Sequence, residues 1–202
     1  MLIRVLSVVL LLCSALSQAA AEPVCKNGYG VTACGYDCVA EFGQVRCAQT
    51  PQGTCGSGYG KVRCWDPPPD VVSWMNYVRS PEPAQCIAAL GQVACGFNCR
   101  SGYGQVHCAQ TPVGACAAAY NQIRCWDPEP DVLWNMAYSD QILDAECITE
   151  YGQVACGYHC TAAYGKVRCA QSPLGSCIAQ RGEILCWDPA SSFAEPRRRR
   201  RP

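Results

Sequence analysis

The sequence predicts a small, disulfide-rich, β-dominated fold in which three tandem modules follow one another along the chain. Three observations predict it. The cysteines recur in three identical sets, a glycine falls at one fixed position in nearly every segment between them, and a β-branched residue follows two positions later. Modules of about 40 residues, built from short strands and Gly/Pro turns with little helix, are typical of such a pattern.

The first 21 residues have the order of a secretory signal peptide. Arg4 supplies the positive charge, Val5 to Leu12 the apolar stretch, and Ala19 to Ala21 the small residues before a cleavage site. No other run approaches the roughly 20 apolar residues that a membrane-spanning helix needs. We therefore expect a secreted, extracellular protein, placed in the periplasm or on the cell surface if the source is bacterial.

Cysteine usage agrees with an oxidising compartment. The chain has 19 cysteines, and removal of Cys13 with the signal peptide leaves an even number. The remaining cysteines form three sets that recur every 61 residues, with eight, three, eight, seven and eight residues between successive members. Each set ends in Cys-Trp-Asp-Pro, and a module this small usually needs staples to hold its core.

Six cysteines allow 15 pairings within a module, and the sequence alone leaves these open. The repeated eight-residue spacing favours pairing of each cysteine with the one nine positions later. The favoured disulfides are Cys25–Cys34, Cys38–Cys47, Cys55–Cys64, Cys86–Cys95, Cys99–Cys108, Cys116–Cys125, Cys147–Cys156, Cys160–Cys169 and Cys177–Cys186.

The pattern divides the chain into seven segments. After the signal peptide (1–21), we expect module 1 at 22–64, module 2 at 86–125 and module 3 at 147–190. Two proline-containing inter-module segments, 65–85 and 126–146, separate them, and each could begin a short amphipathic helix with Asp70 or Asp131 as N-cap. The final segment, 191–202, contains five consecutive arginines and is expected to be disordered.

Nine segments, each joining a cysteine to the one nine positions later, share one layout. The sixth position is glycine in eight of them and Asn121 in the other, which indicates a positive φ. We expect a helical turn or tight loop after the first cysteine and about three short strands in each module. An aromatic residue precedes the glycine in most segments and is expected to pack in the core or hairpin. These aromatic residues are Tyr29, Phe42, Tyr59, Tyr103, Tyr120, Tyr151 and Tyr164.

Catalysis and metal binding have little support in the sequence. The two histidines, His107 and His159, lie at non-equivalent positions, and no nucleophile or zinc-protease motif is present. The closest cysteine pairs have three intervening residues and are better explained as disulfide partners than as zinc ligands. We therefore expect no enzyme activity, no cofactor, no metal site and no small-molecule substrate.

Two surfaces are candidates for ligand binding. Trp65, Trp126 and Trp187 recur in each Cys-Trp-Asp-Pro motif and would suit either sugar stacking or packing on a neighbouring disulfide. Arg46, Arg63, Arg124 and Arg168 recur on the polar face of the strands and would suit a carboxylated or sulfated polymer, or form an ordinary solvated face.

Charge and repetition set the expected function. The chain has 16 basic and 16 acidic residues, but five of the arginines lie in the C-terminal tail, so the modules are acidic and the tail is basic. Three similar modules suit avidity or spacing. We expect a structural or adhesive extracellular role, with multivalent binding of glycans or anionic polymers as the alternative and an inhibitor or toxin-like effector as a further one. The expected partners are an extracellular glycan or anionic polymer, or other copies of the chain.

Overall fold

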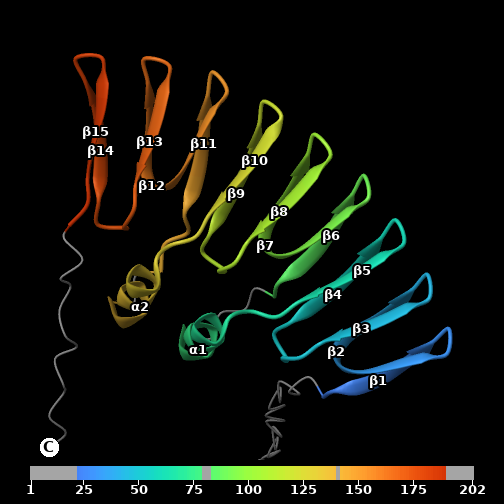
Figure 1. Cartoon of the computed structure of the whole chain (residues 1–202). Coiled ribbons are helices and arrows are strands. Elements are labelled where there is room, and N and C mark those ends of the chain that lie inside the picture. The colour runs from blue at the N-terminus through green and yellow to red at the C-terminus, as the bar shows by residue number, and fades with distance from the viewer. Residues whose placement is uncertain (1–21, 79–82, 140–141, 190–202) are drawn as a thin grey trace, which may run out of the picture.

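The described part of the chain is a curved row of nine β-hairpins with two short helices along one edge (Figure 1). The computed structural model describes residues 22–78, 83–139 and 142–189, so the expected signal peptide and the arginine-rich tail lie outside the described residues. The expected fold class is confirmed, because strands in repeated small units dominate and helices are few.

Each module contains five strands that make three hairpins, so the expectation of about three strands was wrong. The strands of module 1 are β1 (Val24–Gly28), β2 (Val31–Glu41), β3 (Gln44–Ala48), β4 (Thr54–Gly58) and β5 (Lys61–Trp65). Those of module 2 are β6 (Gln85–Ala89), β7 (Gln92–Gly102), β8 (Gln105–Ala109), β9 (Ala115–Ala119) and β10 (Gln122–Trp126). Those of module 3 are β11 (Glu146–Glu150), β12 (Gln153–Ala163), β13 (Lys166–Ala170), β14 (Ser176–Gln180) and β15 (Glu183–Trp187).

The extra strands come from the residues after the first cysteine of each segment. Ala117 to Ala119, expected in a turn, are extended and pair with β10 in register. The reason is the two-residue connection that follows, since it brings the flanking residues directly opposite one another. The joint of three residues between Cys34 and Cys38 also differs from a turn: it is an irregularity within the eleven-residue strand β2, which is shared by two hairpins.

A disulfide closes every hairpin. The structure pairs the cysteines as the spacing favours, nine positions apart, and the two Cα atoms of each pair lie 3.9–4.1 Å apart across the two strands. Cys25 and Cys34, for example, are direct cross-strand partners. Each disulfide therefore fixes the register of one hairpin independently of the others.

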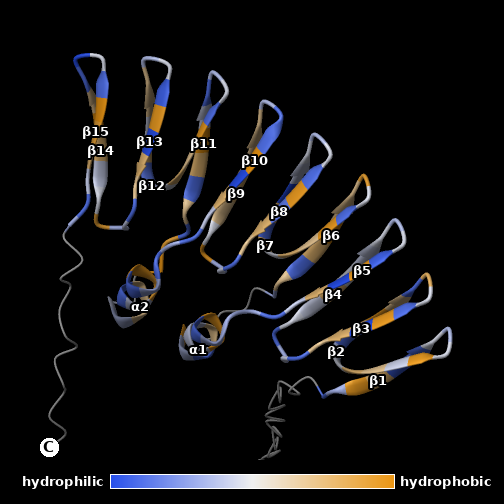
Figure 2. Ribbon diagram, viewed as in Figure 1, coloured by the Kyte–Doolittle hydropathy of each residue, from blue (hydrophilic) through white to orange (hydrophobic). Residues whose placement is uncertain are grey.

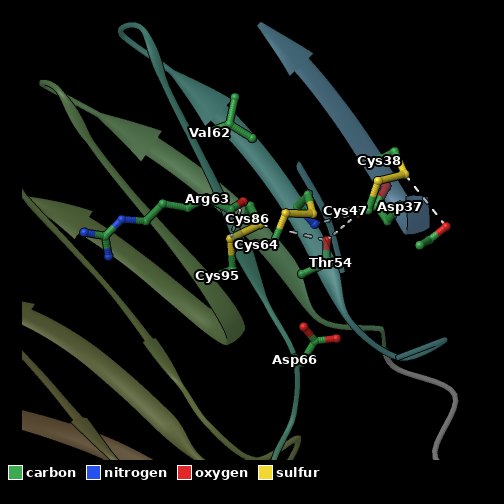
Figure 3. The surroundings of a disulfide bond; sticks show 12 residues. Asp37, Cys38, Cys47, Thr54, Val62, Arg63, Cys64, Asp66, Cys86 and Cys95 are labelled. Carbon is green, nitrogen blue, oxygen red and sulfur yellow. Dashed lines mark hydrogen bonds between the residues drawn. A yellow bond between two sulfur atoms is a disulfide. The ribbon is translucent and has the colours of Figure 1, made fainter. Parts of the chain in front are cut away.

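The disulfides also stack the hairpins on one another (Figure 3). The Sγ atom of Cys86 lies 3.9 Å from the hydroxyl oxygen of Thr54, and that of Cys95 lies 3.8 Å from the carbonyl oxygen of Arg63, both in the preceding hairpin. A Cβ at Gly56 would collide with the Cβ of Cys86. The disulfide of one hairpin thus packs on the backbone of the hairpin before it, which brings the hairpins close together.

A row of β-branched side chains runs beside the disulfides on the same face of each hairpin. Eight of these nine residues are buried, because the preceding hairpin covers them: Val45, Val62, Val93, Val106, Ile123, Val154, Val167 and Ile184. The ninth, Thr32, is exposed, since no described hairpin precedes the first one. The alternation of apolar and polar residues along the strands is visible in Figure 2.

The aspartate of each Cys-Trp-Asp-Pro motif holds the turn that starts the third hairpin. Asp127 Oδ1 accepts hydrogen bonds from the backbone N–H of Thr111 at 2.7 Å and from its hydroxyl at 2.8 Å. The turn itself is closed by a hydrogen bond from Gly114 N–H to the Thr111 carbonyl, as the Thr-Pro-x-Gly order predicts. Asp66 and Asp188 hold the equivalent turns.

Both inter-module segments contain a ten-residue helix, α1 (Pro69–Val78) and α2 (Pro130–Ser139). The expected helices are present, but Asp70 and Asp131 lie in the first turn instead of at the N-cap. The first helical hydrogen bonds run to the carbonyls of Pro68 and Glu129, because a proline suits the first helical position.

The two helices build the main apolar cluster of the described residues. Trp74 is buried, and its indole N–H donates to the Leu133 carbonyl at 2.7 Å, which ties α1 to α2. Phe97 and Tyr158, from the joints of modules 2 and 3, complete the cluster. The helices therefore lie at the inner edge of the row, away from the hairpin turns on the outer arc (Figure 1).

Candidate functional site

The most conspicuous surface is the row of hairpin turns, which we call the tip row. Each turn has two residues, and both have positive φ in all nine hairpins, which defines type I′ turns. The first residue of eight turns is aromatic or leucine and is 60–80% exposed. The tip row consists of Tyr29, Phe42, Tyr59, Leu90, Tyr103, Tyr120, Tyr151, Tyr164 and, at the ninth turn, Arg181.

Several tip side chains lie against the next turn along the row. The ring of Phe42 lies 3.9 Å from the Cβ position of Gly60, and that of Tyr151 lies 3.8 Å from the Cβ position of Gly165. The contact of the Tyr120 ring with Gly152 is closer, at 3.1 Å, so that a Cβ there would force the ring to move. These glycines serve both the turn and the packing of the preceding tip.

The expectation that these aromatic residues pack in the core or within the hairpin was wrong. The type I′ turn places them at the outer end of each hairpin, beyond the last cross-strand pair, where no strand covers them. Turn chemistry does not explain their presence either, because the first position of a type I′ turn favours asparagine, aspartate or glycine. Tyrosine with positive φ is uncommon and is retained here at six of nine turns.

A groove on one side of the row is a second candidate surface. It has a volume of about 640 Å³ and lies between β5, the β6–β7 turn, β7 and β8. Its polar lining includes Lys61, Arg63, Gln92, His107 and Gln110, and no carboxylate lines it. The ammonium group of Lys61 donates to the Gly91 carbonyl at 3.1 Å, which bridges two hairpins at the rim.

The structure brings only part of the sequence-derived candidate surface together. Arg63 and Trp65 both line this groove. Arg46, Arg124 and Arg168 are exposed on β3, β10 and β13, so the four arginines are spread along the row instead of forming one cluster.

The three tryptophans of the Cys-Trp-Asp-Pro motifs differ in environment. Trp65 packs edge-on against Phe97 with ring centroids 5.5 Å apart, and Trp126 packs in the same way against Tyr158. Each of these indoles also donates a hydrogen bond from Nε1, Trp65 to Gln110 and Trp126 to Gln171. Each of these two tryptophans thus packs on an aromatic ring of the next module. Trp187 follows the last hairpin and is 62% exposed.

His159 and the cysteines make other contacts in the described part of the chain, whereas His107 lines the groove. His159 Nε2 lies 2.9 Å from the Pro173 carbonyl oxygen, and the 18 cysteines from Cys25 to Cys186 form the nine disulfides. Within residues 22–78, 83–139 and 142–189, no three His, Cys, Asp or Glu side chains are grouped so that they could hold a metal ion. Neither described helix has the length and apolar character to cross a membrane.

One buried hydroxyl has a shifted pKa. Burial, and to a lesser extent the charge of Asp144, raises the pKa of Tyr158 above its ordinary range. The hydroxyl contacts Met136 Sδ at 3.5 Å within the helix cluster. Phe97 holds the equivalent place in module 2, so this hydroxyl is dispensable for packing.

Comparison with known proteins adds no relative: the chain matches no protein-family model, and no curated protein or solved structure is significantly similar to it.

Proposed function

We propose that this protein is a non-catalytic extracellular adhesion scaffold that holds an extended polymer along its tip row. The observation that supports this proposal is the set of eight exposed apolar tip side chains on a rigid, disulfide-closed frame. Tyrosine offers a large and rigid contact area with a polar end, which makes it a favoured residue in binding surfaces.

Backbone strain strengthens the argument from exposure. A non-glycine residue with positive φ is disfavoured, and asparagine would relieve the strain at the first turn position. Natural sequences violate a local rule mainly where function needs the residue. Six tyrosines and one phenylalanine at such positions therefore indicate selection for the ring, since stability alone favours asparagine.

A polymer suits the geometry because the tips follow one another along the outer arc of a curved row (Figure 1). Seven of the nine tips offer a single ring each, so that one contact is weak. Several contacts to the same chain add through effective concentration. The faces of sugar rings in a polysaccharide repeat in the same manner, which makes an extended glycan the ligand class that fits best.

The test uses a fourfold variant in modules 2 and 3: Tyr103→Asn, Tyr120→Asn, Tyr151→Asn and Tyr164→Asn. Asparagine keeps the type I′ turn, so the variant should fold and retain its disulfides. We expect its binding to insoluble polysaccharides, measured by pull-down on cellulose, chitin and related polymers, to fall at least about tenfold. Arg181→Asn is the matched control, because it changes the same turn position without removing a ring.

Two results would contradict the proposal. One is that the wild-type protein binds none of the polymers. The other is that the fourfold variant and Arg181→Asn bind as the wild type does, which would assign the binding to another surface.

The groove supports a second candidate function, the binding of anionic groups. Lys61, Arg63 and His107 line it without an opposing carboxylate. If it binds a sulfated or carboxylated polymer, retention on a heparin column should fall with rising salt and with Arg63→Gln, while the tip variant should leave it unchanged. Equal retention of wild type and Arg63→Gln would exclude the groove.

A further inference from the structure

The contact between successive modules occurs twice within the chain, with the same parts each time. At the first junction, the Trp65 ring lies edge-on to Phe97 and its Nε1–H donates to Gln110 Oε1 at 2.7 Å. At the second junction, Trp126 meets Tyr158 at the same centroid distance of 5.5 Å and donates to Gln171 at 3.0 Å. One half of this contact comes from the end of a module and the other half from the start of the next.

The C-terminal end of the row carries the first half without the second. Trp187 stands where Trp65 and Trp126 stand, but no described module follows it, and it is 62% exposed. On the same end face, the cross-strand pair Ile178 and Leu185 is 57% and 53% exposed. The row therefore ends in an apolar face that resembles an unoccupied module junction.

The N-terminal end carries the second half without the first. Tyr36 stands where Phe97 and Tyr158 stand, and it is partly exposed where each of those rings is only 3% exposed. The disulfide Cys25–Cys34 is exposed, whereas its equivalent Cys86–Cys95 packs on the preceding hairpin.

Gln49 is oriented as a hydrogen-bond acceptor at this end. Its Nε2 donates to the Cys47 carbonyl at 3.2 Å, and Gln110 and Gln171 each make the equivalent bond at 3.3 Å. In those two residues, this bond directs Oε1 toward the tryptophan of the preceding module. Gln49 therefore presents its Oε1 in the same orientation, and no described indole reaches it.

The larger side chains of the C-terminal face are compatible with such a contact. Ile178 replaces Gly56 and Ala117 of the earlier third hairpins. Ile87 and Ile148 hold the same register position in the first hairpins of modules 2 and 3, on the face turned to the next hairpin. An isoleucine between stacked hairpins thus already occurs twice in this fold.

We infer that copies of this protein associate head to tail, with the last hairpin of one copy stacked on the first hairpin of the next. Trp187 would pack on Tyr36 of a second copy and donate to its Gln49, which repeats the junction within the chain. Such a contact joins two different faces, so it leaves one free face at each end and builds an open filament instead of a closed dimer.

The junction between copies differs from the internal junctions at one position. Thr32 stands where Val93 and Val154 are buried, so a hydroxyl is placed in the contact. Burial of a hydroxyl without a partner weakens association. Thr32→Val should therefore tighten self-association by about tenfold, since the side chain keeps its shape and loses the polar group.

Sedimentation velocity of the full exported protein, with disulfides intact, tests the inference. The wild type should form species larger than dimers as concentration rises. Ile178→Lys blocks the exposed face of the last hairpin, which is the tail of the head-to-tail contact, and Thr32→Lys blocks the exposed face of the first hairpin, which is its head. Each variant should remain monomeric. Both residues are exposed, so neither change should disturb the hairpins. An equimolar mixture of the two variants should form a 1:1 dimer and nothing larger, since only one intact head and one intact tail remain.

Other outcomes would overturn the inference. A wild type that stops at a dimer, together with a Thr32→Lys variant that still dimerises, would show a symmetric contact between two tails. A wild type that stays monomeric at every concentration would show that the ends do not associate. Trp187→Ala with unchanged assembly would exclude the tryptophan contact on which the register depends.

Discussion

Replacement of Asp127 by alanine should destabilise the turn that begins the third hairpin of module 2. Its carboxylate accepts hydrogen bonds from Gln110 N–H at 2.9 Å, from Thr111 N–H at 2.7 Å and from the Thr111 hydroxyl at 2.8 Å. With about 1 kcal/mol net for each of three bonds, the loss is about 3 kcal/mol.

Asp188 gives a matched comparison in module 3. It accepts from the N–H groups of Gln171 and Ser172, but the buried Ser172 hydroxyl makes no hydrogen bond with any described residue. On the same basis, Asp188→Ala should cost about 2 kcal/mol. The comparison isolates the free energy of one hydrogen bond, which the Thr111 hydroxyl donates to its aspartate and the Ser172 hydroxyl does not.

Native-state hydrogen exchange is the suitable assay, because a row of stacked repeats does not unfold as one two-state unit. In Asp127→Ala, the amide protons of Gln110 and Thr111 should exchange about a hundredfold faster, the factor that corresponds to about 3 kcal/mol. Asp127→Asn keeps an acceptor oxygen, so its exchange rates should lie between those of the wild type and those of Asp127→Ala. Unchanged exchange in Asp127→Ala, or an equal effect of Asp188→Ala on its own turn, would refute the reasoning.

Three further predictions follow from the same structure. The cysteines from Cys25 to Cys186 should include no free thiol and should gain 18 hydrogens on full reduction, and a non-reduced digest should yield the nine pairs of the hairpins; a titratable thiol among them or a pair between hairpins would contradict this. Tyr158→Phe should melt like the wild type at neutral pH. Because burial raises the pKa of Tyr158 in the fold, the stability linked to its proton is present below the unfolded value of about 10 and is lost as the pH rises above it, so the variant should melt higher than the wild type in alkali. Gly96→Ala should prevent accumulation of folded protein, since its Cβ would collide with the Ala109 carbonyl, whereas Gly182→Asn should be tolerated because nothing lies near that position and Asn121 already occupies an equivalent turn; equal yields of folded protein from the two variants would count against this account.

The sequence determined the local parts of this protein. The glycine turns and the β-branched row could be predicted because each depends on residues within about ten positions of one another, and the 61-residue period could be predicted because the same cysteine spacing recurs three times. The spacing also favoured the cysteine pairs of the structure, since a two-residue turn midway between two cysteines places them directly opposite. The helices were expected for the same local reason, although each N-cap was assigned two residues too late.

Only the tertiary structure decided which of these residues face solvent. The aromatic residue before most of the turn glycines suggested packing, because buried aromatic side chains dominate the energetics of small cores. The type I′ turn carries it past the last strand pair, where no neighbour covers it, so the tip row was invisible in the pattern. The partners of Trp65 and Asp127 could not be predicted for a related reason, because they are distant in the sequence. Phe97 lies 32 residues after Trp65, and Thr111 lies 16 residues before Asp127. Each hairpin has two faces that alternate along the strand, and only the direction of stacking decides which face meets which neighbour. That direction buries Val45 and leaves Thr32 and Trp187 open at the two ends of the row.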